Sequence, residues 1–531
     1  MQQQFRVLPL ALAIALTTPA SYATNGMLAH GYGTQSKGMA GAGVAYGTSA
    51  MIAATNPANM VTVGNRVEGG LAIFSPRREY KASYNPSVAA GLAPLDAGAP
   101  GAPIQLPVGT FFVGNGKNES GKKYFYIPHL AFNMMIDENS SFGVTIGGNG
   151  GMNTHYDISN NTQAATFVGD FPGDGTPDLT NPANQQLLSG APAQVSSNPC
   201  DPQAARIAGS DDAGAQAALT GRLPLGFTGD SLADNGAQRV PGIFGDCRST
   251  GIDLSQLFVG LTYARKMGNT NVGATLLLAA QQFKAYGLNS FAAFVADGNP
   301  DSLTNNGYDT SYGMGARFGV THTLDMFTIG ASYQTKTYMT KLDKYSDLFA
   351  NGGELDIPAS ATIGLAIKPM DGFTVVLDVQ HIWYSDVDAM GNSNDLVGQV
   401  PNESCVMGDF SRCLGGGNGA GFGWNDLTVI KLGAEYWLND NLSVRAGYSR
   451  STNQVLPKKQ LEFNILAPAP IRAHFTLGAT FKISDTDAIS FAGMYAPREH
   501  VKGVNRFAGG LQNLNVSMKQ YELEFSYSHQ F

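Results

Sequence analysis

The feature that most constrains this chain is an alternation of side chains with a period of two residues. In the last eleven residues, apolar and aromatic side chains occupy every second position. They are Tyr521, Leu523, Phe525, Tyr527, His529 and Phe531, and the positions between them hold Glu522, Glu524, Ser526, Ser528 and Gln530. Because successive side chains of a strand point to opposite sides, this segment predicts a strand with one apolar and one polar face. A strand of a soluble β-sandwich shows the same alternation, so its surroundings need further evidence.

The same pattern recurs in residues 124–136, 327–339 and 473–483, each about as long as a tilted strand that crosses a membrane. Charged residues make up only 14% of the 531 residues, against about 25% in soluble proteins. After the N-terminus no uncharged apolar stretch of about 18 residues occurs, which excludes a helical membrane protein. The net charge of −8 gives no electrostatic footprint for nucleic acid. These features predict an all-β fold, a transmembrane antiparallel β-barrel.

Residues 1–23 predict export. Arg6 gives a positive start, residues 7–16 form a short apolar core, and residues 21–23 supply a small-x-small cleavage site. A signal peptide therefore ends at Ala23. The alternative, an N-terminal membrane anchor, is disfavoured because the apolar run is too short.

The four cysteines are Cys200, Cys247, Cys405 and Cys413. An even number in an exported chain favours two disulfides, and proximity in the sequence favours Cys200–Cys247 and Cys405–Cys413 among the three possible connectivities. No CxxC motif or nearby histidine pair accompanies them, so we expect neither a metal site nor a cofactor.

The alternation and the turn residues between segments predict about fourteen strands. Their ranges are 66–80, 122–137, 140–156, 251–266, 270–286, 308–322, 326–341, 354–368, 372–387, 425–438, 441–451, 470–483, 487–499 and 517–531. Short turns with Asn, Asp or Gly alternate with long connections, notably 157–250 and 388–424. Short periplasmic turns and long extracellular loops are typical of outer-membrane barrels. Both cysteine pairs then fall in extracellular loops.

Residues 24–64 do not show the pattern of a strand and are rich in Gly, Ala, Ser and Met. Their end carries the string Asn56-Pro57-Ala58. A barrel of fourteen strands leaves an open lumen, so this segment is well placed to fold inside as a plug. The predicted organisation is a signal peptide, a plug at 24–64 and a barrel at 65–531.

At this point the chain resembles the FadL/TodX family of outer-membrane transporters for long-chain fatty acids and hydrocarbons. The resemblance rests on the Gly-rich stretch 36–44, the Asn56-Pro57-Ala58 motif, residues 357–365 (Ile-Pro-Ala-Ser-Ala-Thr-Ile-Gly-Leu) and the terminal Phe531. It implies a monomeric barrel in the bacterial outer membrane with an N-terminal hatch. It also implies that an apolar ligand is captured by surface loops, passes to an inner pocket and leaves sideways into the membrane lipid. Loop 157–250 is longer than the family pattern.

The third predicted strand contains Gly147, Gly148, Asn149, Gly150 and Gly151. Glycine weakens a strand and marks bulges or bends. The run predicts either a simple bulge or an inward kink that opens the wall to lipid, as the family resemblance implies.

Candidate ligand contacts are Arg317 and Lys336 for a carboxylate. Apolar contacts are expected from Met27, Met39, Phe291 and Phe294. Strand parity places the two cations in the lumen, where the simpler explanation is that paired charges brace the barrel or the plug.

Three classes of function compete. The first is passive uptake of long-chain fatty acids or of aromatic and alkane hydrocarbons. An enzyme is disfavoured because the eight histidines are scattered without a catalytic constellation. A general porin would lack the Gly-rich plug, and an adhesin would use loop 157–250.

Overall fold

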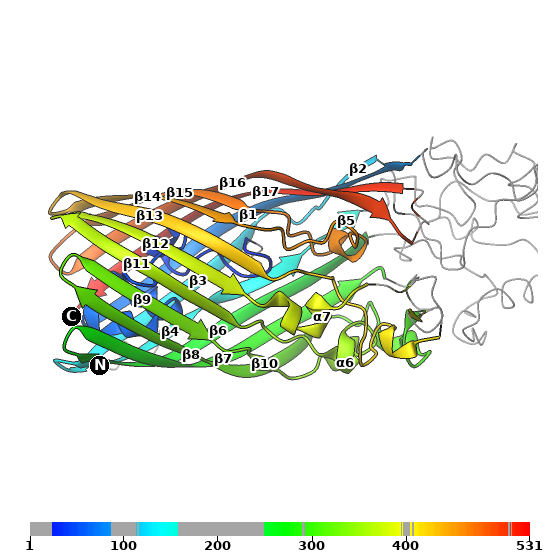
Figure 1. Ribbon diagram of the computed structural model, residues 1–531, viewed down its shortest axis with the longest axis horizontal. Helices are drawn as coiled ribbons and strands as arrows, with labels where there is room; N and C mark the ends of the chain where they lie inside the picture. Colours follow the sequence, from blue (N-terminus) through cyan, green and yellow to red (C-terminus); the bar gives the residue numbers. More distant parts are fainter. Residues whose placement is uncertain are drawn as a thin grey trace, which may run out of the picture.

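The computed structural model describes residues 24–85, 113, 116–157, 249–288, 291, 294–394, 396, 404–405, 408–507, 510 and 512–531. The predicted signal peptide, Cys200, Cys247 and nearly all of loop 157–250 lie outside these residues. The described strands form one antiparallel sheet that closes on itself, because β1 (Arg66–Tyr84) pairs with β17 (Gln512–Gln530) along its whole length (Figure 1).

Fourteen long strands make the wall in the described part of the chain, and each pairs with its neighbours in sequence. Besides β1 and β17 they are β3 (Phe125–Asp137), β4 (Ser140–Asn153), β6 (Ser249–Met267), β7 (Thr270–Tyr286), β8 (Asp309–Leu324), β9 (Phe327–Gln334), β11 (Ser360–Met370), β12 (Phe373–Ile382), β13 (Leu427–Asn439), β14 (Leu442–Ser451), β15 (Ala473–Lys482) and β16 (Asp487–Asn505). Three short strands continue the wall above its longer members, namely β2 (Gly116–Glu119), β5 (Tyr156–Asp157) and β10 (Tyr338–Met339). The predicted all-β barrel of fourteen strands is confirmed.

Some predicted strand ends are wrong. The strand expected at 354–368 begins only at Ser360, because Pro358 lacks the N–H that a ladder requires. The strand expected at 326–341 breaks after Gln334 and resumes briefly as β10. Conversely, much of the loop expected at 500–516 is strand, since β16 and β17 continue beyond the membrane by pairing with each other.

The alternation separates the two surfaces of the wall as predicted. On β17 the side chains of Leu523 and Phe525 are 67% and 46% exposed, whereas Glu522 and Glu524 are each 3% exposed. The apolar side chains therefore face the lipid and the polar ones face the lumen. No helix among the described residues is long and apolar enough to cross a membrane.

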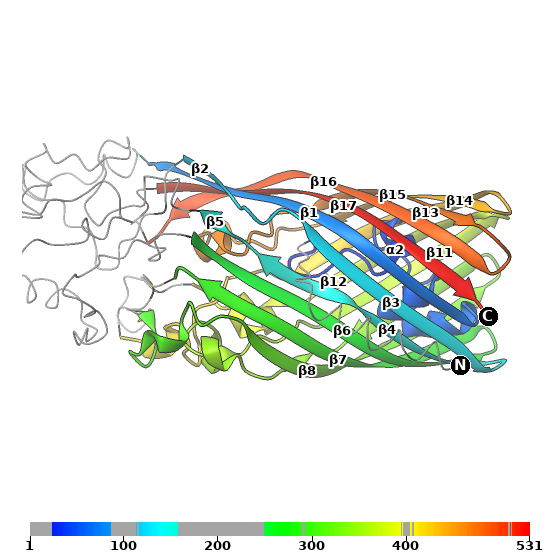
Figure 2. The ribbon, with the colours of Figure 1, turned by 180° about the vertical axis from the view of Figure 1, so that it is seen from behind.

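Residues 24–65 lie inside the barrel as a compact segment, which we call the plug (Figure 2). It contains the helix α2 (Thr34–Lys37) and the 3-10 helices η2 (Ala50–Ala54) and η3 (Pro57–Thr62). The C-terminus lies at the end of the barrel that has short turns (Figure 1). The opposite end carries the long connections with α6 (Ala350–Gly353), α7 (Asp388–Gly391), η5 (Pro300–Ser302), η6 (Asp343–Tyr345), η7 (Tyr384–Asp386), η9 (Phe410–Arg412) and η10 (Phe463–Ile465).

Candidate functional site

Buried charges hold the plug to the barrel wall. Lys37 Nζ lies 2.9 Å from a carboxylate oxygen of Glu522 and 2.5 Å from one of Glu524, and its side chain is only 3% exposed. On the other side of the plug, Asp378 Oδ2 accepts hydrogen bonds from the backbone N–H groups of residues 43–44, at 2.8 and 3.0 Å. These wall carboxylates belong to the polar lumen face, as the alternation predicts for Glu522 and Glu524, but the partners of all three depend on the fold of the plug.

The Asn56-Pro57-Ala58 motif docks on β8. Asn56 Nδ2 donates to the carbonyl of Val44 at 2.6 Å and to the carbonyl of Val320 at 3.2 Å, while its Oδ1 accepts from Ala58 N–H at 3.0 Å. Asn56 therefore both caps η3 and fastens it to the wall. Only an amide before the proline offers the donor and the acceptor that these two roles need.

Glycines in the wall give the plug its room. A Cβ atom added at Gly273 would lie 2.5 Å from the carbonyl carbon of Pro57, and one at Gly319 would overlap Asn56 Oδ1. The same close approach to plug atoms recurs around the wall at Gly143, Gly150, Gly330, Gly364, Gly433, Gly447 and Gly478. Many of the strand glycines therefore contact the plug directly and leave no space for a side chain.

The wall has a gap between β3 and β4. Their ladder ends at the pair His129 and Gly147, and above it β4 continues to pair only with β6 (Figure 2). Pro128 comes next on β3 and has no N–H to donate, which marks an edge at this point. Higher up, the gap is closed again by a 2.7 Å hydrogen bond from Gly121 N–H to the His155 carbonyl. The region between these two closures is called the wall gap below.

The start of the plug occupies the edge of β4 that β3 leaves free. Gly151 N–H donates to the carbonyl of Met27 at 3.0 Å, and Ala29 N–H donates to the carbonyl of Asn149 at 3.1 Å. The register between β4 and β6 shifts at the glycine run, between Gly148 and Gly150. The predicted kink residues thus lie where plug, gap and wall meet.

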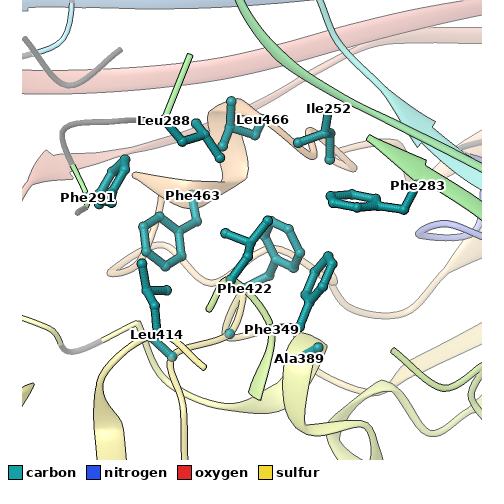
Figure 3. Close-up of a pocket in the computed structure, with 13 residues that line it drawn as sticks. Ile252, Phe283, Leu288, Phe291, Phe349, Ala389, Leu414, Phe422, Phe463 and Leu466 are labelled. Carbon is teal, nitrogen blue, oxygen red and sulfur yellow. The ribbon is translucent and has the colours of Figure 1, made fainter. Parts of the chain in front are cut away.

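An apolar pocket lies among the loops at the extracellular end (Figure 3). It is lined by Ile252, Phe283, Leu288, Phe291, Leu348, Phe349, Ala389, Leu414, Ala420, Gly421, Phe422, Phe463 and Leu466. Phe291 and Phe463 meet edge to face at 5.3 Å. The predicted Cys405–Cys413 disulfide is confirmed and lies beside the pocket, where Leu414 N–H donates to the Phe294 carbonyl at 2.8 Å.

The structure brings three of the predicted ligand contacts together and keeps the other three apart. Phe291, Phe294 and Met27 belong to one apolar cluster with the pocket, whereas Met39 packs in a separate cluster against β11 and β12. Arg317 is buried under the plug and donates to the Ala53 carbonyl at 3.4 Å and to the Gln334 side chain at 2.5 Å.

Lys336 is partly exposed near the rim. Its Nζ lies 3.6 Å from an Asp356 carboxylate oxygen and donates to the Asp386 carbonyl at 3.1 Å. Whether Arg317 or Lys336 contacts a ligand stays a prediction.

Tyr384 links the pocket to the plug, and sequence reasoning missed it. Its hydroxyl donates to the Asn25 carbonyl and accepts from Met27 N–H at 3.2 Å. Burial raises the pKa of Tyr384, so the phenol stays neutral and can do both. Its ring meets Trp424 edge to face at 5.2 Å, and Trp424 in turn lies 5.9 Å from the pocket residue Phe422. No local sequence pattern marks this contact, because Tyr384 lies 357 positions after Met27 in the chain.

Comparisons with known proteins agree with this architecture. Residues 255–525 match the outer membrane protein transport protein family (OMPP1/FadL/TodX). No curated protein sequence matches the chain. The toluene transporter TodX of P. putida aligns over 94% of this chain and 99% of its own, with 18% identity and a TM-score of 0.55.

A FadL homologue of Pseudomonas aeruginosa aligns over 95% and 100% of the two chains, with 13% identity and a TM-score of 0.54. The toluene transporter TbuX of Ralstonia pickettii aligns over 94% and 99%, with 16% identity and a TM-score of 0.51. At these identities the likeness establishes the fold.

Proposed function

Because the chain belongs to the outer membrane protein transport family of FadL and TodX, and so forms an outer-membrane channel for hydrophobic compounds, we propose that its substrates are small neutral hydrocarbons. Monoaromatic compounds are the first candidates, and long-chain fatty acids are the alternative substrate class. The observation that carries this choice is the lining of the loop pocket, in which no residue is charged.

The lining suits a neutral ring. Five phenylalanines contribute to it, and their rings can pack edge to face against an aromatic guest. The cavity measures about 40 Å³, room for about three waters at roughly 10–15 Å³ each, so an aromatic ring enters only when the lining side chains move apart. A carboxylate buried here would lack a cationic partner, which disfavours a charged head. The likeness to two structures described as toluene transporters supports the same choice.

The proposed route joins the pocket to the wall gap. A guest that separates Phe422 from Trp424 acts on Tyr384, which holds the first residues of the plug. When Asn25 and Met27 move away, the edge of β4 at the glycine run becomes free. The guest then leaves sideways into lipid and avoids crossing water, which suits an apolar solute.

The substrate test compares labelled toluene with labelled oleate in a host that lacks its own transporters of this kind. We expect the wild type to raise toluene uptake well above the empty vector and oleate uptake little. Phe463→Ser should remove most of the gain because it places a hydroxyl in the pocket. Phe410→Ser is the matched control, since Phe410 is an exposed loop residue outside the lining. Strong oleate uptake without toluene uptake would contradict the proposal and favour fatty acids.

The lateral route has its own test. A Cβ at Gly150 would overlap the Met27 carbonyl oxygen, so Gly150→Val should displace the start of the plug. Replacing residues 147–151 together by β-branched residues should instead straighten β4 and close the wall gap. If toluene uptake survives in a variant with a regular β4, the lateral route is wrong.

A further inference from the structure

The outer surface of the wall carries a basic patch at the extracellular end of three adjacent strands. β16, β17 and β1 run side by side toward that end (Figure 2). Tyr495, Tyr521 and Ser75 are register partners across them. Beyond this row, the cationic side chains that are at least partly exposed are Arg77, Lys81, Arg498, Lys502 and Lys519, and we call these five the basic patch.

The patch differs in charge from the rest of the chain. The carboxylates on the same parts of the three strands are those of Glu79 and Glu499. Five cations and two carboxylates leave a charge of +3, whereas the whole chain has a net charge of −8. A local excess of this kind attracts anions to one face of the barrel.

The patch lies at the level of the lipid head groups. On the outer face of β17, the order from the membrane centre outward is Phe525, Leu523, Tyr521 and then Lys519. The rings of Tyr521 and Tyr495 pack with their centres 5.4 Å apart. Tyrosines exposed on the lipid face form the girdle between lipid tails and head groups. The first cations of the patch therefore follow directly above the hydrocarbon of the outer leaflet.

Arg77 and Lys519 form a pair of like charges at this level. They are register partners in the ladder between β1 and β17, and this ladder continues without a shift on both sides of them. Like charges directly opposite each other on one face of a sheet repel. Within the described residues no carboxylate oxygen lies within 4.0 Å of either cationic group, the limit of an ion pair. An anion between the two would remove this repulsion.

Aromatic rings orient both cations and leave their donors available. Arg77 Nη2 donates to the Tyr124 hydroxyl at 2.7 Å, and its guanidinium carbon lies 4.8 Å from the centre of that ring. Lys519 Nζ lies 5.5 Å from the ring centre of Tyr521. A guanidinium and an ammonium group together carry more N–H donors than this single hydrogen bond uses. Arginine grips a phosphate with paired hydrogen bonds and lysine adds a point charge, so a phosphate fits the pair.

A second row of cations lies further out. Lys81 is four residues beyond Arg77 on β1, which places it about 13 Å farther along the strand. Lys81 and Lys502 are both register partners of Asn515, so they flank it from β1 and β16. A head group with a second negative charge beyond the first would meet these two lysines.

The carboxylates of the patch already have partners. Glu79 pairs with Arg498 at 2.9 Å and with Lys117 of β2 at 3.3 Å. Glu499 interacts electrostatically with Arg450 of β14, which lies outside the patch. Neither carboxylate is therefore left to neutralise Arg77 and Lys519.

We propose that the basic patch binds a phosphorylated glycolipid of the outer leaflet whose head group carries two phosphates. Arg77 and Lys519 hold the phosphate next to the girdle, and Lys81 and Lys502 attract the one farther out. The acyl chains lie along the apolar outer face of β17 below. An ordinary phospholipid has one phosphate and would use the lower pair alone. The site does not depend on which compound the channel carries.

The test is native mass spectrometry of the purified full-length protein in a non-ionic detergent. The protein is titrated with lipid A that carries two phosphates, with lipid A freed of phosphate, and with phosphatidylglycerol. Wild type should bind one lipid A with two phosphates and bind the other two lipids more weakly. Arg77→Met and Lys519→Met should each lower the affinity about fivefold, and the double variant about twentyfold, because each cation near a lipid surface contributes separately.

Two further variants separate a lost charge from a disturbed fold. Arg77→Lys keeps the charge and should retain most of the affinity. Lys482→Met is the matched control and should stay within about twofold of the wild type. Lys482 also lies over a ring, 4.5 Å from the centre of Trp437, but at the end of the barrel that has short turns. Heat-modifiable migration on gels verifies that each variant forms the barrel.

Three results would overturn the proposal. An affinity of the double variant within about twofold of the wild type would remove Arg77 and Lys519 from the site. Equal binding of lipid A without phosphate would show contact through acyl chains alone. Equal binding of phosphatidylglycerol would exclude a requirement for two phosphates. Since uptake is not the readout, failure of the proposed transport of hydrocarbons would leave the outcome of this test unchanged.

Discussion

Substitution of Lys37 by Met tests whether buried charge holds the plug in the barrel. The change keeps the length of the side chain and removes the ammonium group that lies 2.9 Å from Glu522 and 2.5 Å from Glu524. Both carboxylates are 3% exposed and would be left side by side without their cation. Breaking a buried pair by removing one partner costs about 3–5 kcal/mol.

This cost falls on the docked state of the plug, because the two carboxylates regain water when the plug leaves. Each 1.4 kcal/mol is a factor of ten, so undocking should become roughly 10² to 4 × 10³ times more frequent. Protonation of one carboxylate would relieve part of the repulsion and moves the expected effect toward the lower figure.

Hydrogen–deuterium exchange of the full-length protein measures this directly. The amides of residues 43–44, which bond Asp378, should exchange about 10²-fold faster in Lys37→Met, while amides of β16 and β17 stay protected. Lys519→Met is the control. Lys519 lies on β17, the strand that carries the two carboxylates, but its ammonium group lies over the Tyr521 ring on the outer face. Plug exchange within about threefold of the wild type would refute the idea that this pair clamps the plug.

Three further predictions concern neighbouring contacts. Gly319→Ala should displace Asn56, because the new methyl group overlaps its Oδ1, and exchange at the motif should rise; unchanged exchange would contradict the close fit. Tyr384→Phe should raise exchange at residues 24–29 by about tenfold or more, as the loss of its two hydrogen bonds costs about 1–3 kcal/mol, without affecting the Lys37 clamp. Arg317→Met should lower toluene and oleate uptake alike, since Arg317 bonds the plug; a loss confined to oleate would instead establish it as a carboxylate anchor.

The barrel itself is predictable from the sequence because lipid imposes a rule on every strand. Each wall position faces either lipid or lumen, so a period of two is enforced wherever the chain crosses. This is why strand parity alone predicts that Glu522 and Arg317 face the lumen, where both are buried. The strand boundaries above the membrane are wrong because there the inner faces of β16 and β17 pack on the apolar loop cluster through Val501, Leu514 and Val516, so the alternation of lipid-facing apolar and lumen-facing polar residues no longer holds.

The partners of these lumen residues were not predictable. The plug has no repeating pattern, and its contacts join residues hundreds of positions apart, such as Lys37 with Glu524. One signal was nevertheless present. Glycines at lumen-facing positions, as at Gly319 and Gly433, mark where the backbone of another segment approaches too closely for a side chain. Pro128 is a similar signal, because a proline has no N–H to donate to a neighbouring strand and so marks the edge at the wall gap.

The contacts of the plug divide it into a firmly held part and a loosely held part. Residues 34–44 are fixed by the buried charges of Lys37 and Asp378. Residues 24–29 are held by neutral hydrogen bonds, two with Tyr384 and others to the edge of β4, and by the apolar packing of Met27, Leu28 and Ala29. Neutral bonds contribute about 0.5–1.5 kcal/mol each, far less than a broken buried ion pair costs. The loosely held part is also the one that contacts both Tyr384 and the edge of β4 at the wall gap. On the proposed route we therefore expect opening to move residues 24–29 only, with the clamp intact, so variants of Tyr384 should change the rate of release while variants of Lys37 should change the integrity of the whole plug.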